Sequence, residues 1–179
     1  NFTIDTKGPS VVNITPISGT SFELTDALAI GLSANITDNT TVDTIRANIS
    51  WNLDYYVLTL TLSSGGTYNA TFTNASYLFK PGFVGVYNVT ILSNDTSGNL
   101  NNSETTFFYV NDTTLPNVTI QAPVNGTRFI VTNIALNFTI RDSSLIDLIS
   151  YVLNSNSNVT IDKDTLLNIS NSTFHSLFV

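Results

Sequence analysis

Cysteine and methionine are absent from the 179 residues, and tryptophan and histidine occur once each, as Trp51 and His175. Without cysteine no disulfide can stabilise the chain, which disfavours the disulfide-bonded modules of animal secreted proteins and fits a prokaryotic surface protein better. A cysteine nucleophile is excluded as well. His175 is left as the single imidazole base, and no nucleophile elbow or glycine-rich oxyanion loop accompanies it. We therefore expect no enzymatic activity and no catalytic residue.

Charged side chains are also scarce. They make up 11% of the chain, where about a quarter is usual, so solubility depends on Asn, Ser and Thr. Only six residues are Lys or Arg, and the formal net charge is −7. This balance argues against a nucleic-acid partner, because binding to phosphates requires a cationic surface. No apolar run approaches the roughly 18 residues of a membrane helix, so we expect no membrane insertion by this segment.

A repeat of about 100 residues organises the chain. Residues 113–129, which we name the second joint because they open the second domain, repeat residues 9–22, the first joint, at a spacing of 107. A second block, residues 30–45, returns at residues 134–149 at a spacing of 104. Repeats of this length predict domains of about 100 residues each. The matching pairs are Pro9 and Pro116, Val11 and Val118, Pro16 and Pro123, Gly19 and Gly126, Thr20 and Thr127, Phe22 and Phe129, Ile30 and Ile134, Leu32 and Leu136, Ile36 and Ile140, Asp38 and Asp142, Asp43 and Asp147, and Ile45 and Ile149.

The repeat predicts three segments. Residues 8–112 form one domain, and residues 113–179 form a second domain that lacks about its final third. Residues 1–7 resemble the stretch before the second joint, so they are either the last strand of a preceding domain or a donor strand lent to another chain. Truncation of a longer repeat array also explains the incomplete second domain. Because the chain starts at Asn1, we expect a processed chain or a piece of a longer one, with any signal peptide or anchor outside it.

Apolar and polar residues alternate along several segments, which is typical of half-buried strands. No window has the 3.6-residue apolar period of a helix. In the second joint the apolar residues Val118 and Ile120 alternate with polar residues. The first joint breaks this alternation with Val11, Val12 and Ile14, so we expect a β-bulge in the strand that begins there. Together these signals predict an all-β antiparallel sandwich of about seven strands. Strands are expected near residues 28–37, 45–51, 55–62, 68–72, 85–93 and 105–110, with turns at 38–41, 63–66, 81–82 and 94–99.

Several motifs resemble the immunoglobulin-like repeats of large bacterial and archaeal surface proteins. Gly85-Val86-Tyr87 is similar to the tyrosine corner of such sandwiches, and Trp51 ends the strand that carries the core Trp in antibody domains. Val89 stands where antibody domains have their second Cys. The resemblance therefore implies tandem immunoglobulin-like antiparallel β-sandwiches and not the antibody family. Further matching motifs are the joint with Pro116 and Asn125-Gly126-Thr127, the turn from Asp38 to Asp43, and the turn with Asp95, Gly98 and Asn99.

The N-glycosylation acceptor motif Asn-x-Ser/Thr is far more frequent than chance. It begins at 17 of the 23 Asn residues, whereas the Ser and Thr content would give about six by chance. On the outward face of a strand, polar residues lie two apart, which raises the number of Asn-x-Ser/Thr motifs by itself. Turns and joints have no such period, yet they also contain the motif. We therefore expect covalent N-glycans, and no other cofactor. The candidate residues are Asn1, Asn13, Asn35, Asn39, Asn48, Asn69, Asn74, Asn88, Asn94, Asn101, Asn111, Asn117, Asn125, Asn137, Asn158, Asn168 and Asn171.

Carboxylates are candidates for a calcium site. Asp38 and Asp43 lie five residues apart across a turn, as do Asp142 and Asp147, and Asp95 lies in a later turn. Calcium takes six to eight oxygen ligands, more than any one of these turns supplies. Asp also caps turns by accepting hydrogen bonds from its own backbone. We therefore expect these side chains to cap turns, with no resident metal.

These features predict a non-enzymatic, heavily N-glycosylated structural protein of a prokaryotic cell surface or extracellular filament, with an archaeal source favoured and an S-layer as one form of the surface. Its expected partners are copies of itself or neighbouring repeats, with strand addition as one mode of contact. The alternatives are an adhesin stalk and a non-catalytic accessory region of a secreted enzyme. The adjacent aromatics Phe107, Phe108 and Tyr109 necessarily place one ring outward, which we interpret as core plus a contact between subunits rather than a carbohydrate-binding platform.

Overall fold

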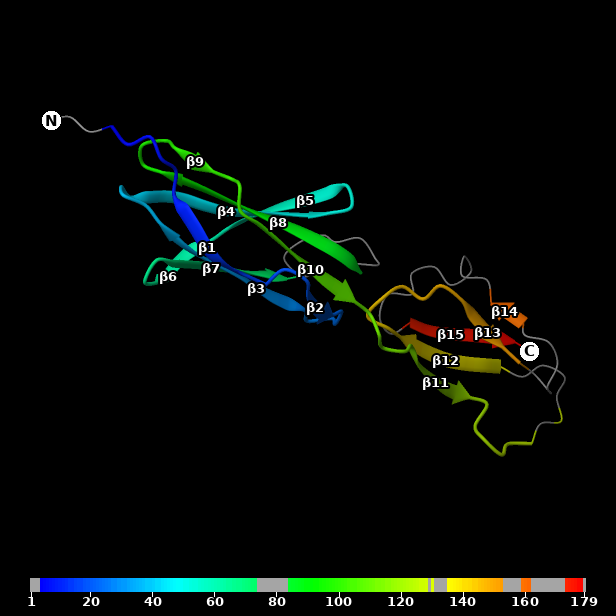
Figure 1. Cartoon of the computed structure of the whole chain (residues 1–179). Coiled ribbons are helices and arrows are strands. Elements are labelled where there is room, and N and C mark those ends of the chain that lie inside the picture. Colours follow the sequence, from blue (N-terminus) through cyan, green and yellow to red (C-terminus); the bar gives the residue numbers. More distant parts are fainter. Residues whose placement is uncertain are drawn as a thin grey trace. The chain divides into compact units, whose positions relative to one another are not determined.

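A computed structural model describes residues 4–73, 84–128, 130, 135–152, 159–161 and 173–178 of the chain. Every regular element in this part of the chain is a β-strand, which confirms the all-β prediction (Figure 1). Among these residues none forms a helix of the length and apolarity that crossing a membrane requires. The chain divides into two compact units, unit 1 at Asn1–Asn111 and unit 2 at Asp112–Val179.

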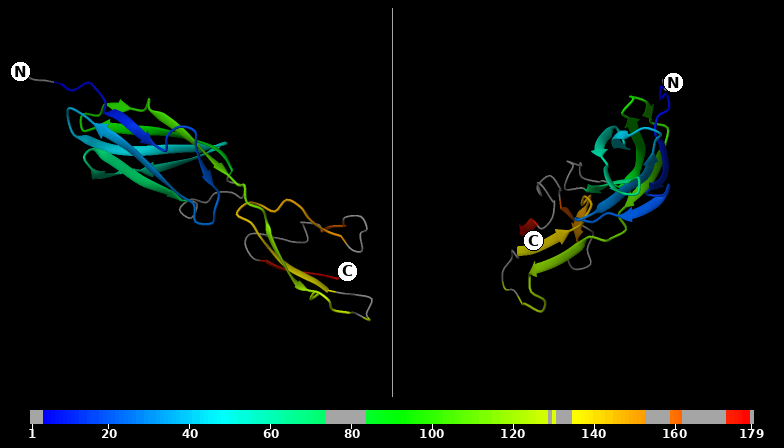
Figure 2. Two further views of the ribbon diagram at one scale, coloured as in Figure 1. Left: turned by 60° about the horizontal axis from the view of Figure 1, so that its bottom comes forward. Right: turned by 90° about the vertical axis from the view of Figure 1, so that its left-hand side faces the viewer.

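Unit 1 is a sandwich of two sheets (Figure 2). Sheet A has four strands in the order β1-β3-β7-β6, and all of its pairs are antiparallel. Its strands are β1 (Ser10–Thr15), β3 (Ala29–Thr37), β6 (Thr61–Ser64) and β7 (Thr67–Thr73).

Sheet B follows the order β2-β10-β8-β4-β5, and the short strand β9 pairs with β8. The pair β2 and β10 is parallel, whereas the other pairs are antiparallel. The chain therefore passes from sheet A to sheet B between β1 and β2. The strands of sheet B are β2 (Thr20–Glu23), β4 (Val42–Trp51), β5 (Asp54–Thr59), β8 (Gly85–Asp95), β9 (Leu100–Asn101) and β10 (Thr105–Asn111).

The two sheets bury one face each against the other. Burial alternates along β3, β4 and β8, as period-2 strands with one buried face require. The half-buried strands predicted at residues 28–37, 45–51 and 85–93 are confirmed, and so is the β-sandwich. The buried residues of the core are Val11, Leu24, Ile30, Leu32, Ala34, Ile36, Ile45, Ala47, Ile49, Leu60, Phe72, Tyr87, Val89, Ile91, Phe108 and Val110.

Tyr87 lies at the centre of an aromatic group in this core. Its ring stacks on Phe108 with centroids 5.0 Å apart and on Trp51 at 6.0 Å. Burial raises the pKa of the Tyr87 hydroxyl well above its usual value, with a smaller contribution from Tyr56, so the group stays protonated. Gly85 has φ of 134°, and a Cβ there would lie 3.2 Å from the Trp51 indole nitrogen, which explains why the start of β8 needs glycine.

Three strand predictions need correction. The single strand expected at residues 55–62 is two strands, β5 in sheet B and β6 in sheet A, because the chain crosses the core at the buried Leu60. Strand β2 was not expected, since it has only four residues and pairs in parallel with a strand more than 80 positions away. The two-residue strand β9 follows a turn that was predicted without it.

The predicted bulge in the first strand is confirmed. The register between β1 and β3 shifts between Val12 and Thr15. Asn13, inside the shifted segment, has φ of 54°, a left-handed conformation that Asn tolerates better than most residues. Pairing with β3 resumes at Thr15, which lies opposite Ser33, just before the chain enters sheet B.

Unit 2 contains a three-stranded sheet in the order β11-β12-β15 and a hairpin of β13 and β14. All of its pairs are antiparallel. Phe138 and Ile140 of β12 are buried, whereas Val118 and Ile120, which pair with them from β11, are more than half exposed. The strands are β11 (Asn117–Ala122), β12 (Ala135–Arg141), β13 (Ile149–Tyr151), β14 (Val159–Ile161) and β15 (Thr173–Phe178).

Candidate glycosylation sites and an acidic cluster

Twelve of the 17 candidate glycosylation residues lie in the part of the chain that the structure describes, and none of these twelve is buried. Asn1, Asn74, Asn158, Asn168 and Asn171 lie outside it. Seven side chains are exposed, namely Asn13, Asn39, Asn69, Asn88, Asn111, Asn117 and Asn125. Five are half-buried, namely Asn35, Asn48, Asn94, Asn101 and Asn137.

The strand residues among them face away from the core. Asn88 lies between the buried Tyr87 and Val89, and Asn48 lies between the buried Ala47 and Ile49. Because side chains alternate across a strand, both amides point to the outer surface of sheet B. Asn35 and Asn69 lie in the same way on the outer surface of sheet A, and Asn137 lies on the face of β12 opposite Phe138.

Some half-buried acceptor amides already have partners. Asn101 Nδ2 donates to the Pro9 carbonyl at 2.8 Å, while Asn101 Oδ1 accepts from the N–H and the hydroxyl of Ser103 at 3.0 and 2.9 Å. Asn35 and Asn94 make one side-chain hydrogen bond each. A glycosylated amide keeps one N–H, so a sugar on Asn101 competes for space with its contact to Pro9.

We expect Asn101 to carry less glycan than exposed acceptors in turns and strands. Asn39 and Asn69 are exposed and serve as internal references. Glycopeptide mass spectrometry of the protein measures occupancy at each residue. Equal occupancy at Asn101 would contradict this expectation and would indicate that sugar is added before the turn around Asn101 folds.

Three carboxylates gather near the turn between β8 and β9. The side chains of Asp5, Asp38 and Asp95 each place an oxygen atom within 4.8 Å of the others. Asp38 and Asp95 were candidates from the sequence, whereas Asp5 was not. Asp43 instead accepts hydrogen bonds from Thr44 and Asn94. The structure thus brings together two of the five candidate carboxylates and adds a third.

Each carboxylate of the cluster caps a turn. Asp95 Oδ1 accepts from the backbone N–H groups of Ser97 and Asn99, both at 2.8 Å, and Asp95 Oδ2 accepts from the Asn99 amide at 2.9 Å. Burial alone raises the pKa of Asp95, but these bonds and a further backbone bond hold it below its usual value. Asp38 accepts from the Thr40 N–H at 2.8 Å, and Asp5 accepts from the N–H of residue 7 at 3.1 Å.

Unit 2 carries a matching pair of carboxylates. Asp112 lies 107 residues after Asp5, and Asp142 lies 104 residues after Asp38. Both cap turns two residues ahead, since Asp112 accepts from the N–H of residue 114 at 3.1 Å and Asp142 from that of Ser144 at 3.0 Å. The Ser144 hydroxyl is the main cause that lowers the pKa of Asp112. Asp147 is exposed.

We expect removal of divalent cations to leave the melting temperature unchanged. Calcium needs six to eight oxygen ligands, and three carboxylates that already accept backbone N–H groups supply fewer than that. Asp5 Oδ2 is the buried carboxylate oxygen of the cluster that has no protein donor among the described residues. Thermal unfolding in a chelator and in millimolar calcium tests this. A midpoint that rises with calcium would show that the cluster holds a cation.

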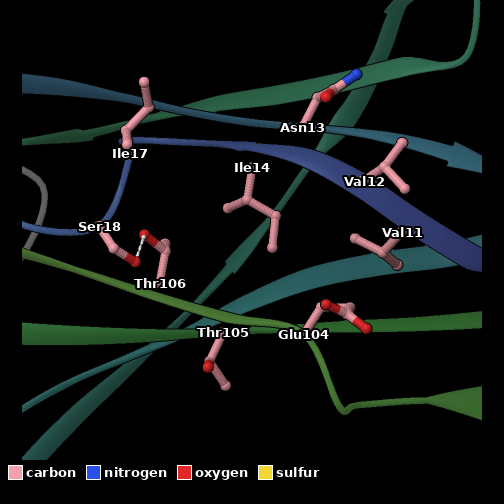
Figure 3. A pocket seen from close by; sticks show the side chains of 9 residues that line it. All are labelled: Val11, Val12, Asn13, Ile14, Ile17, Ser18, Glu104, Thr105 and Thr106. Carbon is pink, nitrogen blue, oxygen red and sulfur yellow. Dashed lines mark hydrogen bonds between the residues drawn. The ribbon is translucent and has the colours of Figure 1, made fainter.

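A groove of about 420 Å³ runs between β1 and the start of β10 (Figure 3). The hydroxyls of Ser18 and Thr106 bond to each other at 3.1 Å at one end of it, and Thr106 also donates to the Pro16 carbonyl at 2.7 Å. Glu104 is the one titratable side chain among the residues that line it. The groove therefore lacks the acid and base pair that general acid–base chemistry uses. His175 belongs to β15, and its side chain lies outside the described part of the structure.

The chain matches no family model and no curated protein. Similar solved structures include the fibronectin(III)-like modules of CbhA from Clostridium thermocellum, with a TM-score of 0.42 and 22% identity over 73% of this chain and 62% of that one. An engineered protein has a TM-score of 0.43 and 14% identity over 57% of this chain and 20% of that one. The chain therefore spans less than two thirds of either structure.

Proposed function

We propose that this chain is a non-enzymatic, N-glycosylated structural module of an extracellular surface. The observation that carries the proposal is the placement of the acceptor residues. Acceptor motifs begin at 17 Asn residues, and all twelve of the acceptors that the structure describes avoid the core while lying on both sheets and in turns. A glycan is bulky and hydrophilic, so an acceptor must lie at the surface.

The scarcity of charge supports the same proposal. A folded protein with 11% charged residues has few ionic groups to hold water at its surface. N-linked sugars supply hydroxyl groups in their place, and their hydration does not change with pH. The module is thereby suited to a prokaryotic cell surface, as part of a filament or an S-layer built from copies of itself or from neighbouring repeats.

Intact-mass measurement tests the glycosylation. Residues 1–179 isolated from the native source should exceed their sequence mass of 19.4 kDa by the mass of many glycans, and deglycosylation should return this segment to that value. The same chain made in a host without N-glycosylation is the matched control. A native mass equal to the sequence mass would end the proposal.

Electron microscopy of the native assembly tests the structural role. Ordered filaments or a lattice are the expected result. Isolated monomers attached to a second, unrelated domain would instead favour the adhesin stalk or the accessory region of a secreted enzyme.

A further inference from the structure

Exposed and half-buried apolar side chains lie on the outer surface of sheet B, on strands β5, β8 and β10. Tyr55 is 70% exposed, and Val57, Val86 and Tyr109 are between 37% and 47% exposed. Phe107 packs edge to face against Tyr109, with ring centroids 5.7 Å apart, and is half-buried. The side chains of this group, with Leu92, form what we name the outer apolar face: Tyr55, Val57, Val86, Leu92, Phe107 and Tyr109.

Two acceptor motifs lie side by side in the middle of this face. The motif that begins at Asn48 is on β4, and the motif that begins at Asn88 is on β8, in antiparallel register. Asn48 is paired with Thr90, and Asn88 is paired with Ser50, so each acceptor lies opposite the hydroxyl residue of the other motif. These are the two central strands of the sheet.

The neighbours of both acceptors on the flanking strands are apolar. On β10, Phe107 is paired with Asn88, and on β5, Val57 is paired with Asn48. Directly paired residues on one face of a sheet have Cβ atoms about 5 Å apart. A sugar on either amide therefore starts within reach of the outer apolar face, over Val57 from Asn48 and over Phe107 from Asn88.

Sheet A provides a contrast. Its exposed acceptor Asn69 lies on β7 and is paired with Ser33 on β3 and with Thr61 on β6. Thr71 is the next outward residue on the same strand. A glycan on Asn69 therefore meets small hydroxyl side chains, which offer it no apolar surface to cover.

Sugars have apolar faces as well as hydroxyl groups. The C–H groups on one side of a pyranose ring can pack against an aromatic face, which carries negative charge density. Exposed apolar surface on a soluble protein often marks a contact with something else. Here it lies in two groups, one on β5 and one on β8 and β10, with the two acceptors between them. The molecule closest to the outer apolar face is the glycan that the chain itself would carry at Asn48 and Asn88, at the centre of the face.

We propose that the N-glycans of Asn48 and Asn88 lie against sheet B and cover the outer apolar face, whereas the glycan of Asn69 extends into solvent. This inference rests on the proposed function, because it requires that the two motifs carry sugar. It assigns these two glycans a second role, which is to shield aromatic surface from contact with other molecules. This role replaces the contact between subunits that we expected from the sequence for the outward rings of Phe107 and Tyr109.

Tyrosine modification in the glycosylated protein tests the inference. Ser50→Ala and Thr90→Ala remove the two motifs while both Asn side chains stay, and Thr71→Ala removes the Asn69 motif as the matched control. Surface iodination, followed residue by residue with peptide mass spectrometry, reports the accessibility of Tyr55 and Tyr109. Intact mass confirms which glycans are lost, and an unmodified Tyr87, which is 1% exposed, shows that each variant is folded.

The double variant should raise the iodination rates of Tyr55 and Tyr109 by roughly two- to tenfold, the range that one aromatic contact supports. Thr71→Ala should leave both rates unchanged. The same three substitutions in protein made without glycans should change nothing, which excludes a direct effect of the small side chains. Unchanged rates in the glycosylated double variant, with Asn48 and Asn88 occupied in the parent, would overturn the inference but leave the proposed function standing. Absence of glycan at every acceptor would overturn both.

Discussion

Phe108→Ala should destabilise unit 1 by about 3–5 kcal/mol, the usual cost of removing a buried aromatic ring. Phe108 is 0% exposed. Its ring stacks on Tyr87 and meets Phe22 edge to face at 5.6 Å and Phe72 at 6.4 Å. Residues from both sheets surround the ring, so the cavity left by alanine cannot close without moving one sheet against the other.

Differential scanning calorimetry measures this effect. A loss of that size should lower the melting temperature of unit 1 by roughly 12–20 °C. Phe107→Ala is the matched control, because Phe107 is the same residue type one position earlier on β10 and faces outward. It should cost less than about 1 kcal/mol. Equal effects of the two substitutions would contradict the assignment of inward and outward faces on β10.

Asp95→Ala should produce the second large effect, a fall in melting temperature of about 10 °C. The carboxylate is 1% exposed and accepts three hydrogen bonds that hold the turn between β8 and β9. Alanine leaves the N–H groups of Ser97, which is exposed, and of Asn99, which is half-buried, without that acceptor. Asp95→Asn keeps one acceptor oxygen, so it should lie between the parent and the alanine variant.

Acid should separate the parent from Asp95→Asn. The folded-state pKa of Asp95 lies below its usual value of about 3.8, so its ionised form stabilises the fold above that pH. This contribution is lost as the pH falls through the folded-state pKa. We expect the melting temperature of the parent to fall more steeply below pH 4 than that of Asp95→Asn. Parallel curves of melting temperature against pH would show that the negative charge of Asp95 does not stabilise the turn.

The sandwich was predictable because its long strands bury one face only. The alternation along β3, β4 and β8 is visible in the sequence, and Ile45, Ala47 and Ile49 are found where it places them. Strand β2 was not predictable in this way, because four residues carry too little periodicity. The division into β5 and β6 depends on Leu60 crossing between sheets, and alternation continues unbroken through that point.

The acidic cluster could not be predicted from the sequence, for a different reason. Asp5 lies 33 residues before Asp38 and 90 before Asp95, and only the folding of two sheets brings the three together. One signal was available, since the spacing of 107 that relates the joints also relates Asp5 to Asp112. The outward placement of the acceptor residues was accessible from alternation. The register that sets Asn48 opposite Thr90 was not, because pairing between β4 and β8 is a property of the tertiary fold.

The parallel pairing of β2 with β10 has a mechanical consequence. The chain enters unit 1 through β1 of sheet A, passes to β2 and leaves unit 1 at the end of β10. Because β2 and β10 are parallel, tension between the start of β2 and the end of β10 pulls these two strands past each other along their length. Their paired residues, from Thr20 and Phe108 to Glu23 and Asn111, are then loaded together rather than one after another. Backbone bonds from Gly19 to Phe107 and from Leu24 to Asn111 extend the loaded row at both ends. This pair of strands therefore resists tension applied along the chain between the start of β2 and the end of β10.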